Sequence, residues 1–446
     1  MKIAMVTLQY KETATGGGGV HVEKICEQFV KLGLDVTIVS IHTNKTLENA
    51  ELTEWETPYS VSRREGVNVV RFLIDKDIEH PYVGDKETEL RRIKTFADVA
   101  VKWLRENEEK FDVVKLHGHH IVPGYMAKEL VGIRPKTISY LHALETTYVT
   151  GKGDFVGAFN GTPEILKRIR EWEAMCRYAD HILVNSPIVE EEIKEIIKEH
   201  DDKAEEYYSK IVLLASGCNS DFLMEDEKIL KKLAKRPDTI NLVTFCRIDP
   251  SKGVEYSIRG AAEAAKLSRY KFCLTIAGMP ASEEYISLLE KESKNVPENL
   301  EVKFKLLKAI SPSPEKEEIL DDKHIYILPT LKEPFGMSLV EASARGNMIV
   351  SADTNGPKYM FESDKGKEIE WGIITPRGVL ASITNDHNKN FSGNVGKAIV
   401  WVLDNWNESV QRVVEFNKKI KSTWTWEGIA GQYVELFETG SIKVRG

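Results

Sequence analysis

Two glutamates, eight residues apart, are of a residue type that can bind a ligand or take part in catalysis. Glu333 and Glu341 lie in the stretch EPFGMSLVEASARG, which follows a strand-like segment. Glu333 is therefore expected in a loop and Glu341 about two turns into the next helix. Carboxylates accept hydrogen bonds from vicinal hydroxyl groups, which sugars and riboses carry. An ordinary helix start with favourable acidic residues explains the same spacing, so the pair alone does not decide.

The residues between the two glutamates suit a ligand-binding helix start. Pro334 is typical of a first helical position, and Gly336 lets the backbone come close to a ligand. Met337 and Ser338 would then present free backbone N–H groups. The stretch predicts a ligand-binding helix N-terminus.

Two cations share a loop in the stretch FCRIDPSKG, residues 245–253. Asp249 and Pro250 predict a turn, so Arg247 and Lys252 are expected at the carboxyl end of one strand, beside a helix start. Such a pair suits a diphosphate. A surface turn with two solvated charges explains this loop equally well.

A glycine cluster, TGGGGVHVE at 15–23, joins the first expected strand to the first expected helix. Four glycines allow positive φ angles and a close approach to an anion, with Gly17 and Gly18 nearest the helix start. His21 and Val22 stand where a dinucleotide-binding fingerprint needs its last glycine, and no Walker sequence follows. An anion-contacting loop is favoured over a flexible turn.

These residues need a scaffold, and short apolar β-branched stretches alternate with amphipathic helices along the whole chain. This alternation predicts parallel strands covered on both faces, in doubly wound α/β sheets. The expected strands are 2–8, 35–41, 68–73, 112–117, 137–142, 181–186, 241–245, 272–278, 324–329, 348–353 and 372–375. The series restarts after the charged stretch 213–239, which predicts a second domain.

Length and composition fit a soluble, globular protein of two domains. The chain has 446 residues and a formal net charge of -8, with no dominant Lys/Arg stretch, so no nucleic-acid partner is expected. No apolar run is long enough to span a bilayer, and the N-terminus is typical of a buried strand and not of a signal peptide. None of the five cysteines forms a C-x-x-C pair, so reduced cysteines and a cytoplasmic location are expected.

Taken together, EPFGMSLVEASARG, RIDPSKG and TGGGGVHVEKI resemble the retaining GT-B glycosyltransferases, in the group of sucrose-phosphate synthase and glycogen synthase. The segments LHGHHIVPGYMA, YLHALETT, NGPKYM and TWEGIAGQYVELF are also similar to this group. The resemblance covers essentially the whole chain.

The resemblance implies two Rossmann-like domains facing across a cleft. Residues 1–218 would form an acceptor-side domain and 219–421 a nucleotide-sugar-binding domain, and a helix within 422–446 would pack back on the first. The implied activity is transfer of a hexosyl group from a nucleotide diphosphate sugar, with UDP-glucose the first choice, to a small sugar, sugar phosphate or polyol. No metal or other cofactor is required in this family. The sequence leaves open the nucleotide, donor sugar, acceptor, oligomeric state and regulation.

Site roles follow from the resemblance, residue by residue. Arg247 and Lys252 would stabilise the departing diphosphate, Glu333 would hold the donor sugar, and Glu341 would bind the ribose. The residues expected to act in catalysis or to bind the donor also include His142, Gly17, Gly18, Gly336, Met337 and Ser338.

The acceptor side matches the family less closely. His117 and His119 belong to the His-rich segment, and Arg168 to a looser match with an Arg-bearing helix; a solvated helix face explains Arg168 equally well. Gly19 stands where the sucrose-phosphate synthases usually carry Gln, and Asn355 where the family has Gly, so the acceptor stays open.

Other interpretations compete with this one. A sugar-nucleotide 2-epimerase uses the same scaffold, and a catalytically silent nucleotide-sugar binding protein would show the same pattern without turnover. Metal sites at DKD, residues 75–77, or HGHH, residues 117–120, are disfavoured because neither stretch has a clear partner carboxylate or cysteine.

Overall fold

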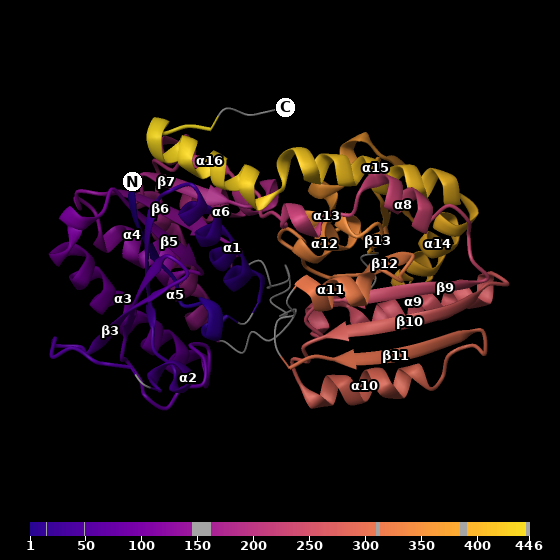
Figure 1. Ribbon diagram of the computed structural model, residues 1–446, viewed down its shortest axis with the longest axis horizontal. Coiled ribbons are helices and arrows are strands. Elements are labelled where there is room, and N and C mark those ends of the chain that lie inside the picture. The colour runs from indigo at the N-terminus through magenta and orange to yellow at the C-terminus, as the bar shows by residue number, and fades with distance from the viewer. Residues whose placement is uncertain (15, 49, 145–161, 309–312, 384–389, 443–446) are drawn as a thin grey trace. The chain divides into compact units, whose positions relative to one another are not determined.

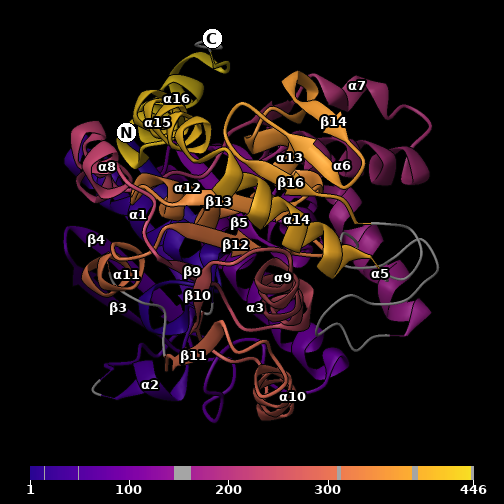
Figure 2. The same ribbon diagram turned by 90° about the vertical axis from the view of Figure 1, so that its right-hand side faces the viewer.

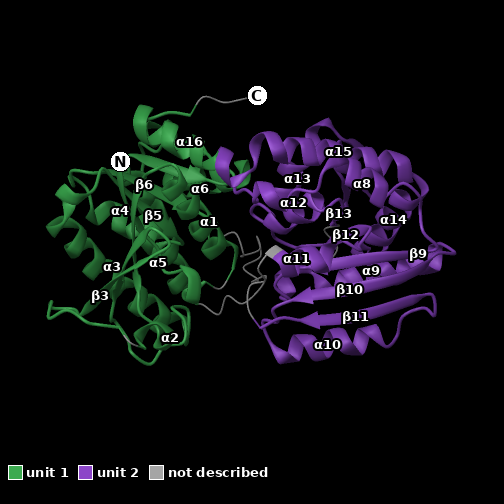
Figure 3. Cartoon of the chain, viewed as in Figure 1, with its two compact units in different colours: residues 1–215, 429–446 green, residues 216–428 purple. Residues whose placement is uncertain are grey.

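The chain forms two compact units, shown in Figure 3. The computed structural model describes residues 1–446 except 15, 49, 145–161, 309–312, 384–389 and 443–446. Unit 1 comprises Met1–Ala215 and Ile429–Gly446, and unit 2 comprises Ser216–Gly428. The sequence places these divisions at 218/219 and 421/422. The chain enters unit 2 once and returns to unit 1 with its last helix.

Unit 1 is built on an eight-stranded sheet of order β3-β4-β2-β1-β5-β6-β7-β8 (Figure 1). All neighbouring pairs are parallel except β3 with β4. The strands are β1 (Lys2–Val6), β2 (Asp35–Ile41), β3 (Tyr59–Arg64), β4 (Val67–Phe72), β5 (Val113–Gly118), β6 (Lys136–Leu141), β7 (His181–Val184) and β8 (Ile211–Leu213).

The helices of unit 1 form where apolar residues recur at helical spacing. In the first of them, Val22, Ile25 and Phe29 are fully buried, which explains why this stretch is an amphipathic helix and not a strand. The α-helices of this unit are α1 (Gly17–Lys31), α2 (Asn44–Leu47), α3 (Lys86–Glu106), α4 (Met126–Glu129), α5 (Pro163–Ala174), α6 (Pro187–His200), α7 (Glu205–Tyr208) and α16 (Trp426–Thr439).

Unit 2 carries a second eight-stranded sheet, of order β11-β10-β9-β12-β13-β16-β15-β14. Its first six strands pair in parallel, whereas β14, β15 and β16 pair antiparallel. The strands are β9 (Thr239–Phe245), β10 (Lys271–Gly278), β11 (Leu300–Leu306), β12 (Ile325–Leu328), β13 (Met348–Ala352), β14 (Lys367–Ile369), β15 (Gly372–Ile374) and β16 (Val379–Ala381).

Helices cover this second sheet, and α9 and α14 lie side by side (Figures 1 and 2). The core between helices and strands contains fully buried residues such as Leu242, Ile327 and Phe391. The α-helices of unit 2 are α8 (Asp226–Lys232), α9 (Val254–Leu267), α10 (Glu283–Ser293), α11 (Ser313–Leu320), α12 (Met337–Ala344), α13 (Asn355–Met360), α14 (Phe391–Asp404) and α15 (Trp406–Thr423).

The predicted fold class is confirmed, with corrections in detail. Each of the eleven expected strands is present, with its ends shifted by two residues or fewer. The segment 372–375 was expected among parallel strands, but β15 is antiparallel. The sequence pattern missed five strands because they are half-exposed or only three residues long: β3, β8, β11, β14 and β16.

A buried lysine lies inside unit 1, on the face of β5 and β6 that α1 covers. The Lys115 side chain is fully buried, and its Nζ lies 3.0 Å from Nδ1 of His117. The amine also lies over the rings of Tyr140 and Tyr433, 4.6 and 5.1 Å from their centroids. In the part of the chain that the structure describes, no carboxylate pairs with it. Burial lowers the pKa of Lys115 to about 7.

Helix α16 is anchored to unit 1 through this same region. The Tyr433 hydroxyl lies 3.2 Å from Nε2 of His21 on α1, and its ring meets Phe29 edge-on at 5.6 Å. Near the end of the helix, Lys136 Nζ donates to the backbone oxygen of Phe437 at 3.1 Å, as a cation stabilises helix C-terminal carbonyls. The expected return of the last helix to the first domain is therefore observed.

Two further features concern the cysteines and the apolar character of the helices. Each of the five cysteines is free of disulfide bonds. Among the residues described, no helix combines the length and the apolar character that crossing a membrane requires.

Replacing Lys115 by Met should change the pH dependence of stability. Between pH 7 and 10.5 the unfolded chain binds a proton at this position that the folded chain has lost, so wild-type stability rises with pH across that window. Lys115→Met should flatten this slope and raise the melting temperature at pH 7. Thermal unfolding at stepped pH measures both. The exposed Lys128→Met is the control, and equal slopes in wild type and Lys115→Met would contradict the interpretation.

Truncating Tyr433 should loosen the anchoring of α16. Tyr433→Ala removes a fully buried ring and should lower the free energy of unfolding by about 3–5 kcal/mol. Tyr178 is 37% exposed, and Tyr178→Ala should change it by less than about 0.5 kcal/mol. Urea titrations of both variants measure the difference. Equal losses would show that Tyr433 does not anchor the helix.

Candidate active site

The loop after β9 is a rigid turn that carries two cations. The side chain of Asp249 accepts hydrogen bonds from the backbone N–H of Ser251 at 2.9 Å and from its hydroxyl at 2.5 Å. This turn leads through Lys252 and Gly253 into α9, as the sequence predicts. Arg247 has a 48% exposed side chain, and Asp249 lies 3.8 Å from its guanidinium. The guanidinium is thus open to solvent, whereas the backbone beneath it is fixed.

Gly253 brings this loop against the end of β12. Its φ is +63°, and a Cβ atom there would lie 2.1 Å from the backbone oxygen of Pro329. Close approach therefore requires glycine. Leu331 N–H donates to the Ser251 oxygen at 2.9 Å, which fastens the two loops together. The carboxyl ends of β9 and β12 consequently present one continuous surface.

An ion pair joins these two loops. Lys252 Nζ lies 2.7 Å from Oε2 of Glu333, and both side chains are largely shielded, with exposures of 17% and 11%. Shielding from water strengthens such a pair relative to an exposed one and makes each partner costly to remove alone. The structure thus brings together two residues that the sequence separates by eighty positions.

Helix α12 begins at Met337, and its N-terminus lies beside Glu333. Gly336 precedes the helix with φ +109°, a left-handed conformation that favours glycine. The helix was expected to start at Pro334; it starts after Gly336 because that conformation cannot continue a helix. The N–H groups of Met337 and Ser338 lie in the first turn, where the helix itself offers no acceptor. They and the helix dipole favour an anion.

Two further contacts hold this stretch in place. Gly356 N–H, at the start of α13, donates to the backbone oxygen of Glu333 at 2.8 Å. Tyr326 on β12 is buried and donates to the Phe245 oxygen at 2.6 Å, and burial holds the pKa of Tyr326 well above its usual range. The loop that carries Glu333 is therefore fixed from both sides.

Glu341 has a different partner. Its Oε1 lies 2.5 Å from Nζ of Lys316 on α11, and both side chains are mostly buried, with exposures of 14% and 16%. Glu333 and Glu341 are thus each paired with a different lysine. Sequence reasoning missed Lys316, because a lysine in the run PEKEE reads as one charge of a solvated helix.

In unit 1 the glycine cluster differs from expectation. Helix α1 starts at Gly17, so Gly17–Gly19 form its first turn and not a loop, and none of Gly16–Gly19 has a positive φ. Space explains one of the glycines, because a Cβ on Gly19 would lie 2.4 Å from that of Ala14. A Cβ on Gly18 would lie 3.6 Å from Cδ2 of His142, which is an ordinary contact distance. Close packing at the helix start therefore requires glycine at position 19.

His142 lies directly under this helix start, just after β6. Asn185 Nδ2 donates to the His142 backbone oxygen at 2.8 Å, and the imidazole lies 6.0 Å from the His21 ring, edge to face. The structure thereby brings Gly18 and His142 together. Their roles stay predictions.

The three residues expected on the acceptor side differ in their burial and in their partners. His117 is 2% exposed and stacks on Tyr140, and burial holds the pKa of His117 well below its usual range. His119 is half-buried, with Nδ1 3.1 Å from the Ala143 oxygen. Arg168 on α5 pairs with Glu87 through both guanidinium nitrogens. His119 thus offers more surface to a ligand than His117.

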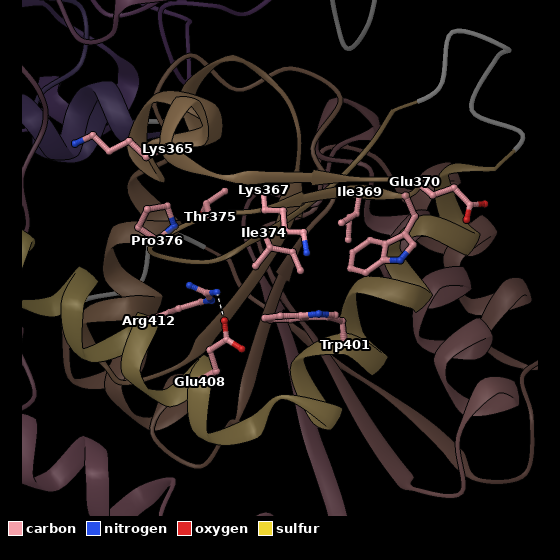
Figure 4. A pocket seen from close by; sticks show the side chains of 11 residues that line it. Lys365, Lys367, Ile369, Glu370, Ile374, Thr375, Pro376, Trp401, Glu408 and Arg412 are labelled. Atoms are coloured by element: carbon pink, nitrogen blue, oxygen red, sulfur yellow. Dashed lines mark hydrogen bonds and ion pairs between the residues drawn. The ribbon is translucent and has the colours of Figure 1, made fainter.

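A separate pocket of about 640 Å³ lies elsewhere in unit 2 (Figure 4). Lys367 and Ile374 of the β14–β15 hairpin face Trp401 and Arg412 of α14 and α15 across it. None of the predicted site residues lines it.

The residues that the structure describes do not form a site that could hold a metal ion. No cluster of three or more His, Cys, Asp or Glu side chains is arranged to do so there. Asp75 of the DKD stretch instead accepts from Asp77 N–H and from Arg92.

Comparison with known proteins agrees with this geometry. The family model "Glycosyltransferase Family 4" matches residues 15–205, and "Glycosyl transferases group 1" matches residues 225–381. Together they cover more than half of the chain, and each falls largely within one unit. The second range includes both cations and both glutamates.

Three individual proteins illustrate the similarity. A protein named as a sucrose-phosphate synthase from Thermosipho melanesiensis is 25% identical, over 96% of this chain and 92% of its own. The sucrose-phosphate synthase structure from Thermosynechococcus elongatus has a TM-score of 0.69 at 14% identity, covering 98% of both chains. Anabaena HepE, solved with UDP and glucose, has a TM-score of 0.63 at 13% identity, covering 98% of this chain and 100% of its own.

The structural likenesses establish the fold, and the two family matches identify the units that build it. Two sheets dominated by parallel strands, with the last helix returning to the first unit, make the GT-B architecture. The chain belongs to the GT-B glycosyltransferases, in the group that includes sucrose-phosphate synthase.

Proposed function

We propose that this enzyme is a retaining glycosyltransferase that moves a hexosyl group from a nucleotide diphosphate sugar to a hydroxyl of a small sugar, sugar phosphate or polyol. The observation that carries the proposal is the shielded Lys252–Glu333 pair beside Arg247 and the start of α12. It combines a cationic surface for a diphosphate with a carboxylate for sugar hydroxyls.

The diphosphate would lie against the loops after β9 and β12. Arg247 has planar donors for bidentate contact with phosphate oxygens, and its exposed guanidinium can reach them. Lys252 adds a point charge, and the N–H groups of Met337 and Ser338 add donors that need no reorganisation. These groups stabilise most strongly the negative charge that builds up as the diphosphate departs.

The transfer step needs no protein nucleophile. The bond from the anomeric carbon to the diphosphate oxygen breaks with its electron pair on the diphosphate. A bond then forms from the acceptor hydroxyl oxygen to the same face of that carbon. The acceptor proton passes to a phosphate oxygen, which balances the charge. Glu333 supports the positive charge on the sugar and Lys252 holds the Glu333 carboxylate in place, an arrangement related to the oxocarbenium chemistry of glycosidases.

The relatives support a choice of nucleotide and acceptor to test first. HepE was solved with UDP and glucose, which supports UDP-glucose as the donor to test first. The sucrose-phosphate synthases among the relatives support a sugar phosphate as acceptor. In unit 1 we assign donor contacts to Gly17, Gly18 and His142, and acceptor contacts to His119, because His117 is buried and Arg168 is paired with Glu87.

Binding and turnover tests address the proposal directly. Thermal shifts with UDP, ADP and GDP should show stabilisation by one of the three. Mass spectrometry with the matching glucose nucleotide and a panel of glucose, fructose 6-phosphate, glucose 6-phosphate and inositol phosphate should then show a glycosylated product that retains the donor's anomeric configuration by NMR. A 2-epimerised donor without release of nucleoside diphosphate would instead establish an epimerase.

Removing Arg247 should slow turnover without unfolding the protein. Loss of one preorganised donor to the departing diphosphate should cost about 10²- to 10³-fold in kcat. The matched control is Arg259→Ala, since Arg259 on α9 has a similar exposure of 45% and pairs with Glu292. Steady-state kinetics and a melting curve of each variant provide the comparison. An Arg247→Ala enzyme with near wild-type kcat would refute the assignment.

A further inference from the structure

The contact between Lys316 and Glu341 joins two helices at the donor side of unit 2. Lys316 lies on α11 and Glu341 on α12, and within the described chain each is the other's only ion-pair partner. The contact distance is 2.5 Å. Cys218 lies close enough that Glu341 helps to raise the pKa of its thiol and Lys316 opposes this. The pair is therefore largely buried within unit 2 and is not a solvent-exposed surface contact.

Such a shielded pair is not explained by stability alone. Exposed ion pairs contribute little, and a largely buried pair costs desolvation that its attraction offsets only in part. Two apolar residues of similar volume would join α11 and α12 at least as well. A role that requires charge is therefore the better account.

The carboxylate of Glu341 has unused accepting capacity. Oε1 is held by Lys316, whereas Oε2 receives no hydrogen bond from any residue that the structure describes. An ionised carboxylate can accept about four hydrogen bonds in all. Oε2 is thus fixed in place and open to donors from a ligand.

We propose that Lys316 is a positioning residue for the donor nucleotide: it holds the Glu341 carboxylate in one orientation, so that Oε2 accepts from the vicinal hydroxyls of the ribose. This rests on the proposed function, which places a nucleotide at α12. Lys316 would act through Glu341 and would not touch the reacting atoms. Its loss should weaken ribose recognition and leave the chemical step nearly intact.

The consequence is selectivity for ribose over deoxyribose. A fixed, charged acceptor loses its partner when a hydroxyl is missing, and a hydrogen bond to a charged group is worth about 10- to 100-fold in affinity. Without Lys316 the carboxylate can turn and take up water, so both kinds of nucleotide should bind with similar, weaker affinity.

Isothermal titration calorimetry tests this selectivity for ribose. The affinities of UDP, ADP and GDP are each compared with those of their 2′-deoxy and 3′-deoxy counterparts. Wild type should bind the ribonucleotide of its preferred base at least about 10-fold more tightly than either deoxy form. Lys316→Met should reduce this ratio to within about 3-fold and raise the donor KM about 10-fold, with kcat changed less than about 2-fold. Lys316→Arg should restore most of the ratio.

The control is Lys305→Met. Lys305 also pairs with a carboxylate on α11, Glu318, but this pair is exposed, with side-chain exposures of 37% and 74%. This variant should keep the wild-type ratio. The ratio of two affinities measured on one preparation does not depend on its active fraction, so partial unfolding of Lys316→Met cannot mimic the result. Lys316→Gln gives a second, milder variant with the same expected direction.

The outcomes separate the two claims. If wild type binds none of the three nucleoside diphosphates, the proposed function fails. If wild type binds one of them with no preference for ribose, or Lys316→Met keeps that preference, Lys316 is only a structural contact between α11 and α12. The inference then fails while the proposed function stands.

Discussion

The ion pair between Lys252 and Glu333 is the constraint around which the site in unit 2 is organised. It links the loops that follow β9 and β12, whose backbones are already hydrogen-bonded at Ser251 and Leu331. With 17% and 11% exposure, neither charge is fully hydrated, so removing one partner would leave the other shielded from water without a counter-charge. Two strands that are neighbours in the sheet thereby present a lysine and a carboxylate at a fixed separation, which sequence spacing alone does not impose.

Much of this could be predicted from the sequence because it follows local rules. Continuous β-branched runs indicated the buried parallel strands, and the turn at Asp249 and Pro250 indicated how Lys252 leads into α9. Half-exposed β11 lacks such a run, and the three-residue strands β14 and β16 are too short to show a period. Their pairing depends on distant residues.

The parts of the site that could not be predicted are long-range contacts. Lys316 and Lys115 have no local signal: one lies in a charged helical run, the other alternates with apolar residues in a strand. Only the fold shows that the first meets Glu341 and the second is enclosed by aromatic rings. The glycine cluster was recognised for a conformational reason, whereas the structure requires Gly19 for close packing against Ala14. The anion contact expected of Gly17 and Gly18 stays a prediction.

The surroundings of the shielded lysines differ between the two units. In unit 2, Lys252 and Lys316 each lie within 2.7 Å of a carboxylate oxygen, on Glu333 and Glu341. In unit 1, Lys115 has rings and an imidazole around it, and burial brings its pKa to about 7. His21, His117 and Tyr140 around this amine are buried, and their rings pack against one another. The lysines of unit 2 are thus stabilised by opposite charge, whereas the buried lysine of unit 1 has rings and imidazole nitrogens around it and no carboxylate partner among the described residues, which is why burial can lower its pKa.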